Sequence, residues 1–172
     1  LVGYNTDYYG ARKVFTEHKI GTGNTMLLFG VGGVARALVL AALDEGLEVL
    51  VSARDPKKLS AFSQEFGVES LPWEERNTYK ADVLMNATSV GMEPETDVLP
   101  LAREALTNFS YIGDIVIKPP RTLLLQEAEK AGIHVMGGHE FVFEQAAKQY
   151  ELYTGEPAPR DIMKKALQVL LD

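Results

Sequence analysis

The chain has 172 residues, of which 46% are hydrophobic, and this length and composition suit one domain with a single sizeable core. Its formal net charge of −7 argues against nucleic acid or an anionic membrane as a partner, so small molecules are the expected ligands. The chain has no cysteine and only three scattered histidines, so no metal site is expected. It shows no membrane-length apolar run and no signal-like leader, which predicts a cytoplasmic protein.

Short apolar runs alternate with longer amphipathic ones along the chain, a pattern typical of βαβ units around a parallel sheet. In chain order, we expect strands at residues 26–29, 48–51, 68–71, 82–86, 111–117 and 133–136, with a loop rich in Pro and Gly before the fifth strand. Helices are expected from residue 5 or 6 and at 35–43, 56–66, 122–131, 139–154 and 161–171. The sequence therefore predicts an α/β fold over residues 1–172, Rossmann-like and doubly wound, with a mostly parallel sheet and helices on both faces.

The turn after the first expected strand is rich in glycine and reads F-G-V-G-G-V-A-R-A. Gly30 permits a tight turn, Gly32 lets the backbone approach a pyrophosphate, and Ala35 allows the helix to pack closely on the strand. The phosphates would then lie on the N-terminus of the helix. A dinucleotide site is the favoured interpretation, and a turn that uses glycine for steric reasons alone is the alternative.

The end of the second expected strand reads S-A-R-D-P-K-K and indicates which dinucleotide binds. An acidic residue there binds the ribose 2′-OH of NAD, whereas a cation accepts the additional phosphate of NADP. Ala53 is not acidic, and Arg54, Lys57 and Lys58 form a cationic cup unless the lysines are simply solvated. Asp55 opposes this assignment, because its carboxylate either neutralises part of the Arg54 charge or binds a 2′-OH itself.

The run N-A-T-S-V-G-M follows the fourth expected strand, at the sheet edge where ligands of α/β proteins bind. Its hydroxyls and amide, including Thr88 and Ser89, would line a nicotinamide or ribose site. A simple turn, in which Asn86 and Ser89 cap backbone groups, explains the same residues equally well.

Taken together, these motifs resemble the C-terminal, NADP-binding half of the shikimate dehydrogenase family. The resemblance covers essentially the whole chain, and its six motifs stand in the family's order. They are N-T-D-x-x-G at 5–10, G-V-G-G-V-A-R at 30–36, A-R-D-P-K-K at 53–58, N-A-T-S-V-G-M at 86–92, D-I-V-I-K-P-P-R-T at 114–122 and E-Q-A-A-K-Q-Y-E-L-Y-T-G at 144–155.

The resemblance implies an NADP-dependent oxidoreductase that reduces 3-dehydroshikimate to shikimate in aromatic amino-acid biosynthesis, the chorismate pathway. In the family a substrate domain precedes the N-T-D segment, so we expect the C-terminal helices to close against that domain. The chain by itself is then expected to bind NADP without turnover. A quinate-oxidising relative and a non-catalytic dinucleotide-binding module are the alternatives.

The resemblance also implies roles for individual residues. In the family, the aspartate of N-T-D pairs with a lysine of the preceding domain at the reacting hydroxyl, and Asp7 takes this catalytic role. A helix N-cap is the alternative for this segment. The residues implied to bind substrate are Asn5, Asp7 and Gln145. The residues implied to bind the cofactor are Gly30, Gly32, Gly33, Val34, Ala53, Arg54, Lys58, Thr88, Ser89, Ile115 and Gly138.

Four residues depart from the family pattern. Ala53 and Asp55 replace an asparagine and a threonine near the adenosine phosphate, which weakens the NADP assignment without reversing it. Ile117 stands where a tyrosine commonly faces the substrate, so one polar contact is missing. His139 replaces an apolar residue, and we interpret it as a helix-start residue rather than a proton donor.

Overall fold

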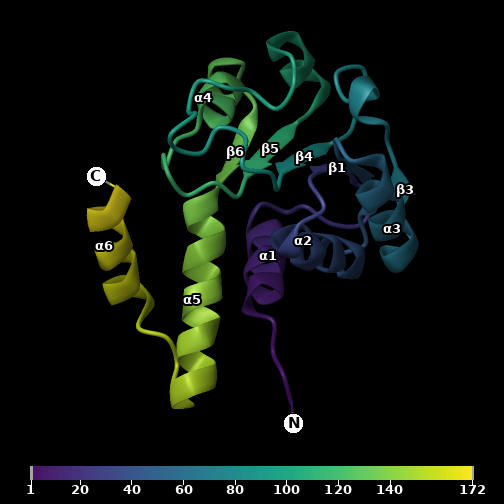
Figure 1. Ribbon diagram of the computed structural model, residues 1–172. Helices are drawn as coiled ribbons and strands as arrows, with labels where there is room; N and C mark the ends of the chain where they lie inside the picture. The colour runs from purple at the N-terminus through teal and green to yellow at the C-terminus, as the bar shows by residue number, and fades with distance from the viewer. Residues whose placement is uncertain (1, 172) are drawn as a thin grey trace.

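The computed structural model describes residues 2–171 and contains a six-stranded sheet, seen in Figure 1 with helices around it. In sheet order the strands are β3 (Glu69–Ser70), β2 (Glu48–Ser52), β1 (Thr25–Phe29), β4 (Val83–Asn86), β5 (Tyr111–Asp114) and β6 (His134–Gly137). All five strand pairings are parallel. Because β1 lies in the middle of the sheet, the turn that follows it sits where the strand order reverses, which is the ligand-binding position of such folds.

Helices cover both faces of the sheet, as the sequence predicts. The helices are α1 (Thr6–Glu17), α2 (Gly33–Asp44), α3 (Pro56–Phe66), η1 (Trp73–Glu75), η2 (Arg103–Asn108), α4 (Leu123–Lys130), α5 (Gly138–Thr154) and α6 (Arg160–Leu171), where η1 and η2 are 3-10 helices. One core cluster joins α1, α2, α3 and the start of α5 to one face, and a second joins η2 and α4 to the other. Alternate strand residues divide between the clusters, because successive side chains of a strand point to opposite faces.

The boundaries of α3 follow from local sequence signals. Its predicted range is confirmed, with Pro56 in the first turn and Gly67 in a left-handed conformation at the C-cap (φ 65°). Asp55 is the N-cap, and one of its carboxylate oxygens accepts hydrogen bonds from the backbone N–H groups of Lys57 and Lys58. Capping therefore gives the Asp55 carboxylate a structural role, while its second oxygen has no partner among the described residues.

The fifth strand is shorter than the sequence predicts. We expected it to reach Ile117, but β5 ends at Asp114. The Asp114 carboxylate accepts a hydrogen bond from the N–H of Val116 at 3.1 Å, and this local bond turns the backbone away from the ladder. The apolar run I-V-I therefore forms a loop at the carboxyl edge of the sheet rather than more strand.

The sequence predicts only a loop between β4 and β5, and this prediction is incomplete. The segment contains the six-residue 3-10 helix η2, in which Ala105 and Leu106 are buried against the sheet. Its apolar residues are too few for a clear helical period, so tertiary packing decides the conformation.

Candidate active site

The turn between β1 and α2 brings open backbone to the carboxyl edge of the sheet. Gly30 has a φ of +100°, and a Cβ added there would lie 2.6 Å from the carbonyl oxygen of Ala87, so a side chain is excluded. Gly32 is the N-cap of α2 and supplies no side-chain cap. A Cβ added at Gly32 or Gly33 would meet nothing within 4 Å. The first turn of α2 is thus uncapped and open, which suits a bound diphosphate.

A cavity of about 580 Å³, here called the glycine-turn cavity, lies beside this turn. The loop after β4 contributes Thr88 and Ser89, and the loop after β5 contributes Ile115 and Lys118. The structure therefore brings Gly32, Gly33, Val34, Thr88, Ser89 and Ile115, all predicted cofactor residues, to one cavity.

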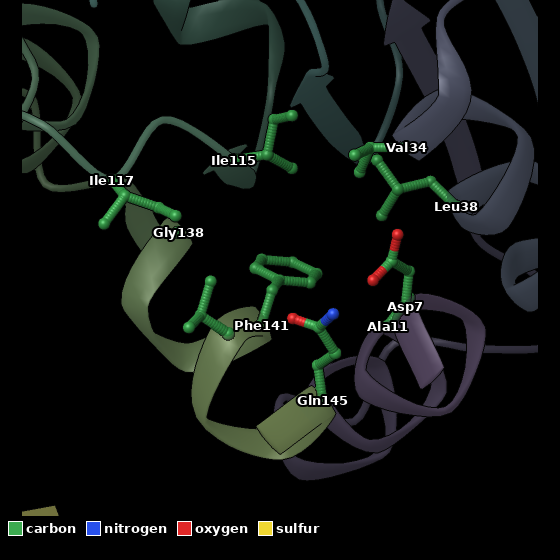
Figure 2. Close-up of a pocket in the computed structure, with 10 residues that line it drawn as sticks. Asp7, Ala11, Val34, Leu38, Ile115, Ile117, Gly138, Phe141 and Gln145 are labelled. Carbon is green, nitrogen blue, oxygen red and sulfur yellow. The ribbon is translucent and has the colours of Figure 1, made fainter. Parts of the chain in front are cut away.

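A second cavity of about 270 Å³, here called the Asp7 cavity, adjoins the first. Figure 2 shows Asp7 of α1 and Gln145 of α5 pointing toward one another beside the ring of Phe141, which also lines this cavity. Val34 and Ile115 line both cavities, so the space runs from the glycine turn to the Asp7 carboxylate. Apart from Asp7 and Gln145, the side chains that line the Asp7 cavity are apolar. This lining favours a ligand that makes few polar contacts with the rest of the cavity.

Asp7 and Gln145 meet because α1 and α5 pack closely side by side, as Figure 1 shows. Gly10 is buried at this contact. A Cβ added there would lie 2.8 Å from the carbonyl oxygen of Phe141 and 3.0 Å from the backbone nitrogen of Gln145. Any side chain at position 10 would push the two helices apart. The sequence alone does not predict this role of Gly10, because it does not show which helix faces it.

The helix carrying Asp7 is capped by another residue. The Oδ1 of Asn5 accepts a hydrogen bond from the N–H of Tyr8 at 3.2 Å, so Asn5 is the N-cap of α1. Asp7 lies in the first turn, and among the described residues its carboxylate has no hydrogen-bond or ion-pair partner. The segment thus does provide a helix N-cap, but the capping residue is Asn5 and not Asp7. Asn5 is exposed and does not line the Asp7 cavity.

A buried polar network, which sequence reasoning missed, holds the two loops of the glycine-turn cavity. Asp114 is fully buried, and its carboxylate accepts hydrogen bonds from the Nδ2 of Asn86, the N–H of Val116 and the hydroxyl of Thr122. The Oδ1 of Asn86 in turn accepts a hydrogen bond from the Thr88 hydroxyl at 2.6 Å. Burial outweighs these donors and raises the pKa of Asp114 from 3.8 to about 6.

We expect Asp114 to make the protein less stable as the pH rises from about 4 to about 6. The native state binds more protons than the unfolded state in this interval, so about 3 kcal/mol of stability is lost as the carboxyl ionises. Asp114→Asn keeps one acceptor oxygen and removes the titration. Urea unfolding at several pH values should show a shallower pH dependence for this variant. Exposed Asp97→Asn is the control, and equal slopes for all three proteins would contradict the prediction.

The cationic residues after β2 lie at the opposite end of the glycine turn from Asp7. Ala53 and Arg54 line a cavity of about 330 Å³ between α3 and the segment that follows β3. Arg54 and Lys58 are exposed, and neither forms an ion pair with any residue that the structure describes. Because Asp55 caps α3, these two cations remain available to an anion.

The first two residues of α5 are Gly138 and His139. A Cβ added at Gly138 would lie 2.4 Å from the Val116 carbonyl oxygen, so glycine is needed for α5 to begin against the loop after β5. His139 is the second residue of α5, which confirms its place at a helix start. Its Nδ1 is buried and has no partner among the described residues.

Two further searches of residues 2–171 give negative results. No group of three or more His, Cys, Asp or Glu side chains in this range is arranged to hold a metal ion. No helix in this range is long and apolar enough to cross a membrane.

The fold and the site together define a class of protein. A parallel sheet of this order, a glycine turn after the central strand and cavities at its carboxyl edge are the features of a Rossmann-type dinucleotide-binding domain. Comparisons with known proteins show which dehydrogenases this chain is similar to.

Two family models match parts of the chain. The model described as shikimate 5′-dehydrogenase C-terminal domain matches residues 138–168, and that described as NADP oxidoreductase, coenzyme F420-dependent, matches residues 25–102. Among curated relatives, the NADP(+) shikimate dehydrogenases of Haloarcula marismortui and Methanosarcina acetivorans are 36% and 33% identical. Each alignment covers 96% of this chain, which spans 63% and 62% of the respective relative.

Solved structures agree with these matches. The Thermus thermophilus shikimate 5-dehydrogenase in complex with NADP(H) and shikimate is 32% identical, with a TM-score of 0.86 over 96% of this chain and 62% of that one. A chorismate mutase/shikimate 5-dehydrogenase fusion protein from Clostridium acetobutylicum is 29% identical, with a TM-score of 0.88 over 98% and 62% of the two chains. The chain is thus similar to shikimate dehydrogenases over nearly its whole length, it spans less than two thirds of theirs, and its residues 138–168 match the model of their C-terminal domain.

Proposed function

We propose that this chain is the cofactor-binding half of an NADP-dependent shikimate dehydrogenase, which reduces 3-dehydroshikimate to shikimate. One observation carries the proposal: the glycine-turn cavity continues into the Asp7 cavity. A dinucleotide lying on the uncapped end of α2 would place its nicotinamide next to Asp7 and Gln145. The shikimate and NADP(H) bound by the Thermus thermophilus relative support this choice of ligands.

The residues of this chain take distinct roles in the proposed reaction. The bound dinucleotide supplies the hydride. The α2 N-terminus holds its diphosphate, and Arg54 and Lys58 bind the 2′-phosphate that distinguishes NADP from NAD. Asp7 hydrogen-bonds the reacting hydroxyl, with a lysine from another part of the enzyme as its partner, and Gln145 orients the substrate.

The remaining cofactor contacts follow from placing the diphosphate at the N-terminus of α2 and the nicotinamide next to Asp7. Thr88 and Ser89 would contact the nicotinamide ribose, while Ile115 and Gly138 would lie beside the nicotinamide ring. We propose small molecules as the ligands, rather than nucleic acid or a membrane, on the basis of the net charge of −7 and the cofactor in the names of the relatives. A cytoplasmic location remains a proposal beside it.

The chain alone should bind NADPH but show no measurable oxidation of shikimate by NADP. Cofactor contacts come from one sheet, whereas hydride transfer needs a substrate held in near-attack position, and Asp7 and Gln145 are too few contacts for a small polyol. Titration calorimetry with NADPH tests the first point, and the absorbance of NADPH formed from NADP and shikimate or quinate tests the second on the same protein preparation. Failure to bind NADPH would overturn the proposed function. Turnover by the chain alone would show that no lysine from elsewhere is required.

A further inference from the structure

Lys118 occupies a distinctive position in the glycine-turn cavity. It lies in the loop after β5 and lines this cavity together with Gly32 and Gly33 at the start of α2. Among the described residues that line the glycine-turn and Asp7 cavities, Lys118 is the only cation. The roles proposed so far leave it without a function.

The backbone around Lys118 is held in place from both sides. Its carbonyl oxygen accepts a hydrogen bond from the N–H of Glu93 at 3.0 Å, which ties it to the loop after β4. Val116 before it and Thr122 after it both donate hydrogen bonds to the buried Asp114 carboxylate. The side chain therefore starts from a fixed point at the cavity wall.

The charge of Lys118 is not used within the protein. It is exposed, and its ammonium forms no ion pair or hydrogen bond with any described residue. The chain carries a net charge of −7, so the overall field opposes binding of an anionic ligand. A cation near a diphosphate bound to the backbone N–H groups of α2 would add a charge-assisted contact to those of the helix N-terminus.

We propose that Lys118 binds the diphosphate of the dinucleotide from the side opposite the α2 N-terminus. This inference rests on the proposed dinucleotide site and adds a residue to it. Lys118 contributes to the affinity for NADPH and NADH alike, because both carry the diphosphate. It thereby differs from Arg54, whose contribution is limited to ligands with the 2′-phosphate.

Binding measurements on Lys118→Met test this assignment. Titration calorimetry should show affinities for NADPH and for NADH that are each about 10-fold weaker than those of the unmodified chain, from loss of one charge-assisted contact. The affinity for 2′-AMP, which carries the 2′-phosphate but no diphosphate, should be unchanged. Lys118→Arg should retain most of the dinucleotide affinity, since it keeps the positive charge.

Lys80→Met is the matched control, because Lys80 is an exposed lysine that precedes β4 at the opposite edge of the sheet. It removes the same charge and should leave all three affinities unchanged. Affinities of Lys118→Met for NADPH and NADH within twofold of the unmodified chain would overturn the assignment while leaving the dinucleotide site intact. An equal loss for 2′-AMP, or an equal effect of Lys80→Met, would overturn it as well. If the unmodified chain bound no dinucleotide, both the proposed function and the assignment of Lys118 would fail.

Discussion

Asp7→Asn should reduce turnover by about 10²- to 10⁴-fold in a full-length enzyme that contains this chain, the range typical for loss of an acid–base partner. The affinity for NADPH should not change, because Asp7 lies in the cavity beyond the glycine turn. Stability should change little, because Asn5 rather than Asp7 caps α1 and the Asp7 carboxylate has no partner among the described residues. Steady-state rates with shikimate and NADP, with thermal unfolding of the same samples, measure these effects.

Asp161→Asn provides the matched control for Asp7→Asn. Asp161 is likewise an acidic residue in the first turn of a helix, α6, and it is exposed. Both substitutions remove the same interaction with a helix dipole, worth about 0.3–1 kcal/mol, so any difference in turnover reports on the cavity. Near-normal turnover of a well-folded Asp7→Asn enzyme would remove Asp7 from the mechanism.

The second large effect is expected for Arg54→Ala, which should weaken NADPH binding by about 10- to 100-fold and leave NADH binding nearly unchanged. A charge-assisted hydrogen bond to phosphate contributes roughly 1.5–3 kcal/mol, which corresponds to this range of affinities. NADH lacks the 2′-phosphate and has nothing for Arg54 to bind. Titration calorimetry with both cofactors provides the measurement.

Lys57→Ala is the comparison for Arg54→Ala, because Lys57 is an exposed cation near Arg54 that is not among the proposed 2′-phosphate ligands. It should affect the binding of both cofactors little. If the unmodified chain bound NADH as tightly as NADPH, the cationic residues would not select the 2′-phosphate. The free carboxylate oxygen of Asp55 would then be the candidate for the ribose 2′-OH.

The sequence by itself determined the features that depend on neighbouring residues. The range of α3 follows from a capping Asp55, Pro56 in the first turn and a left-handed Gly67, all adjacent along the chain. The need for glycine at position 30 follows from its place between an apolar strand and a helix, and its φ of +100° confirms it. The parallel sheet follows from the alternation of apolar runs and amphipathic helices.

The tertiary structure alone decided how distant residues meet. Asp7 and Gln145 come together only because Gly10 lets α1 and α5 approach, and no local pattern encodes that contact. The early end of β5 and the position of Lys118 both depend on Asp114, whose burial among donors from three segments is invisible in its own sequence neighbourhood. The physical reason is that capping and turn signals act over a few residues, whereas close packing and desolvation depend on which segments the fold brings together.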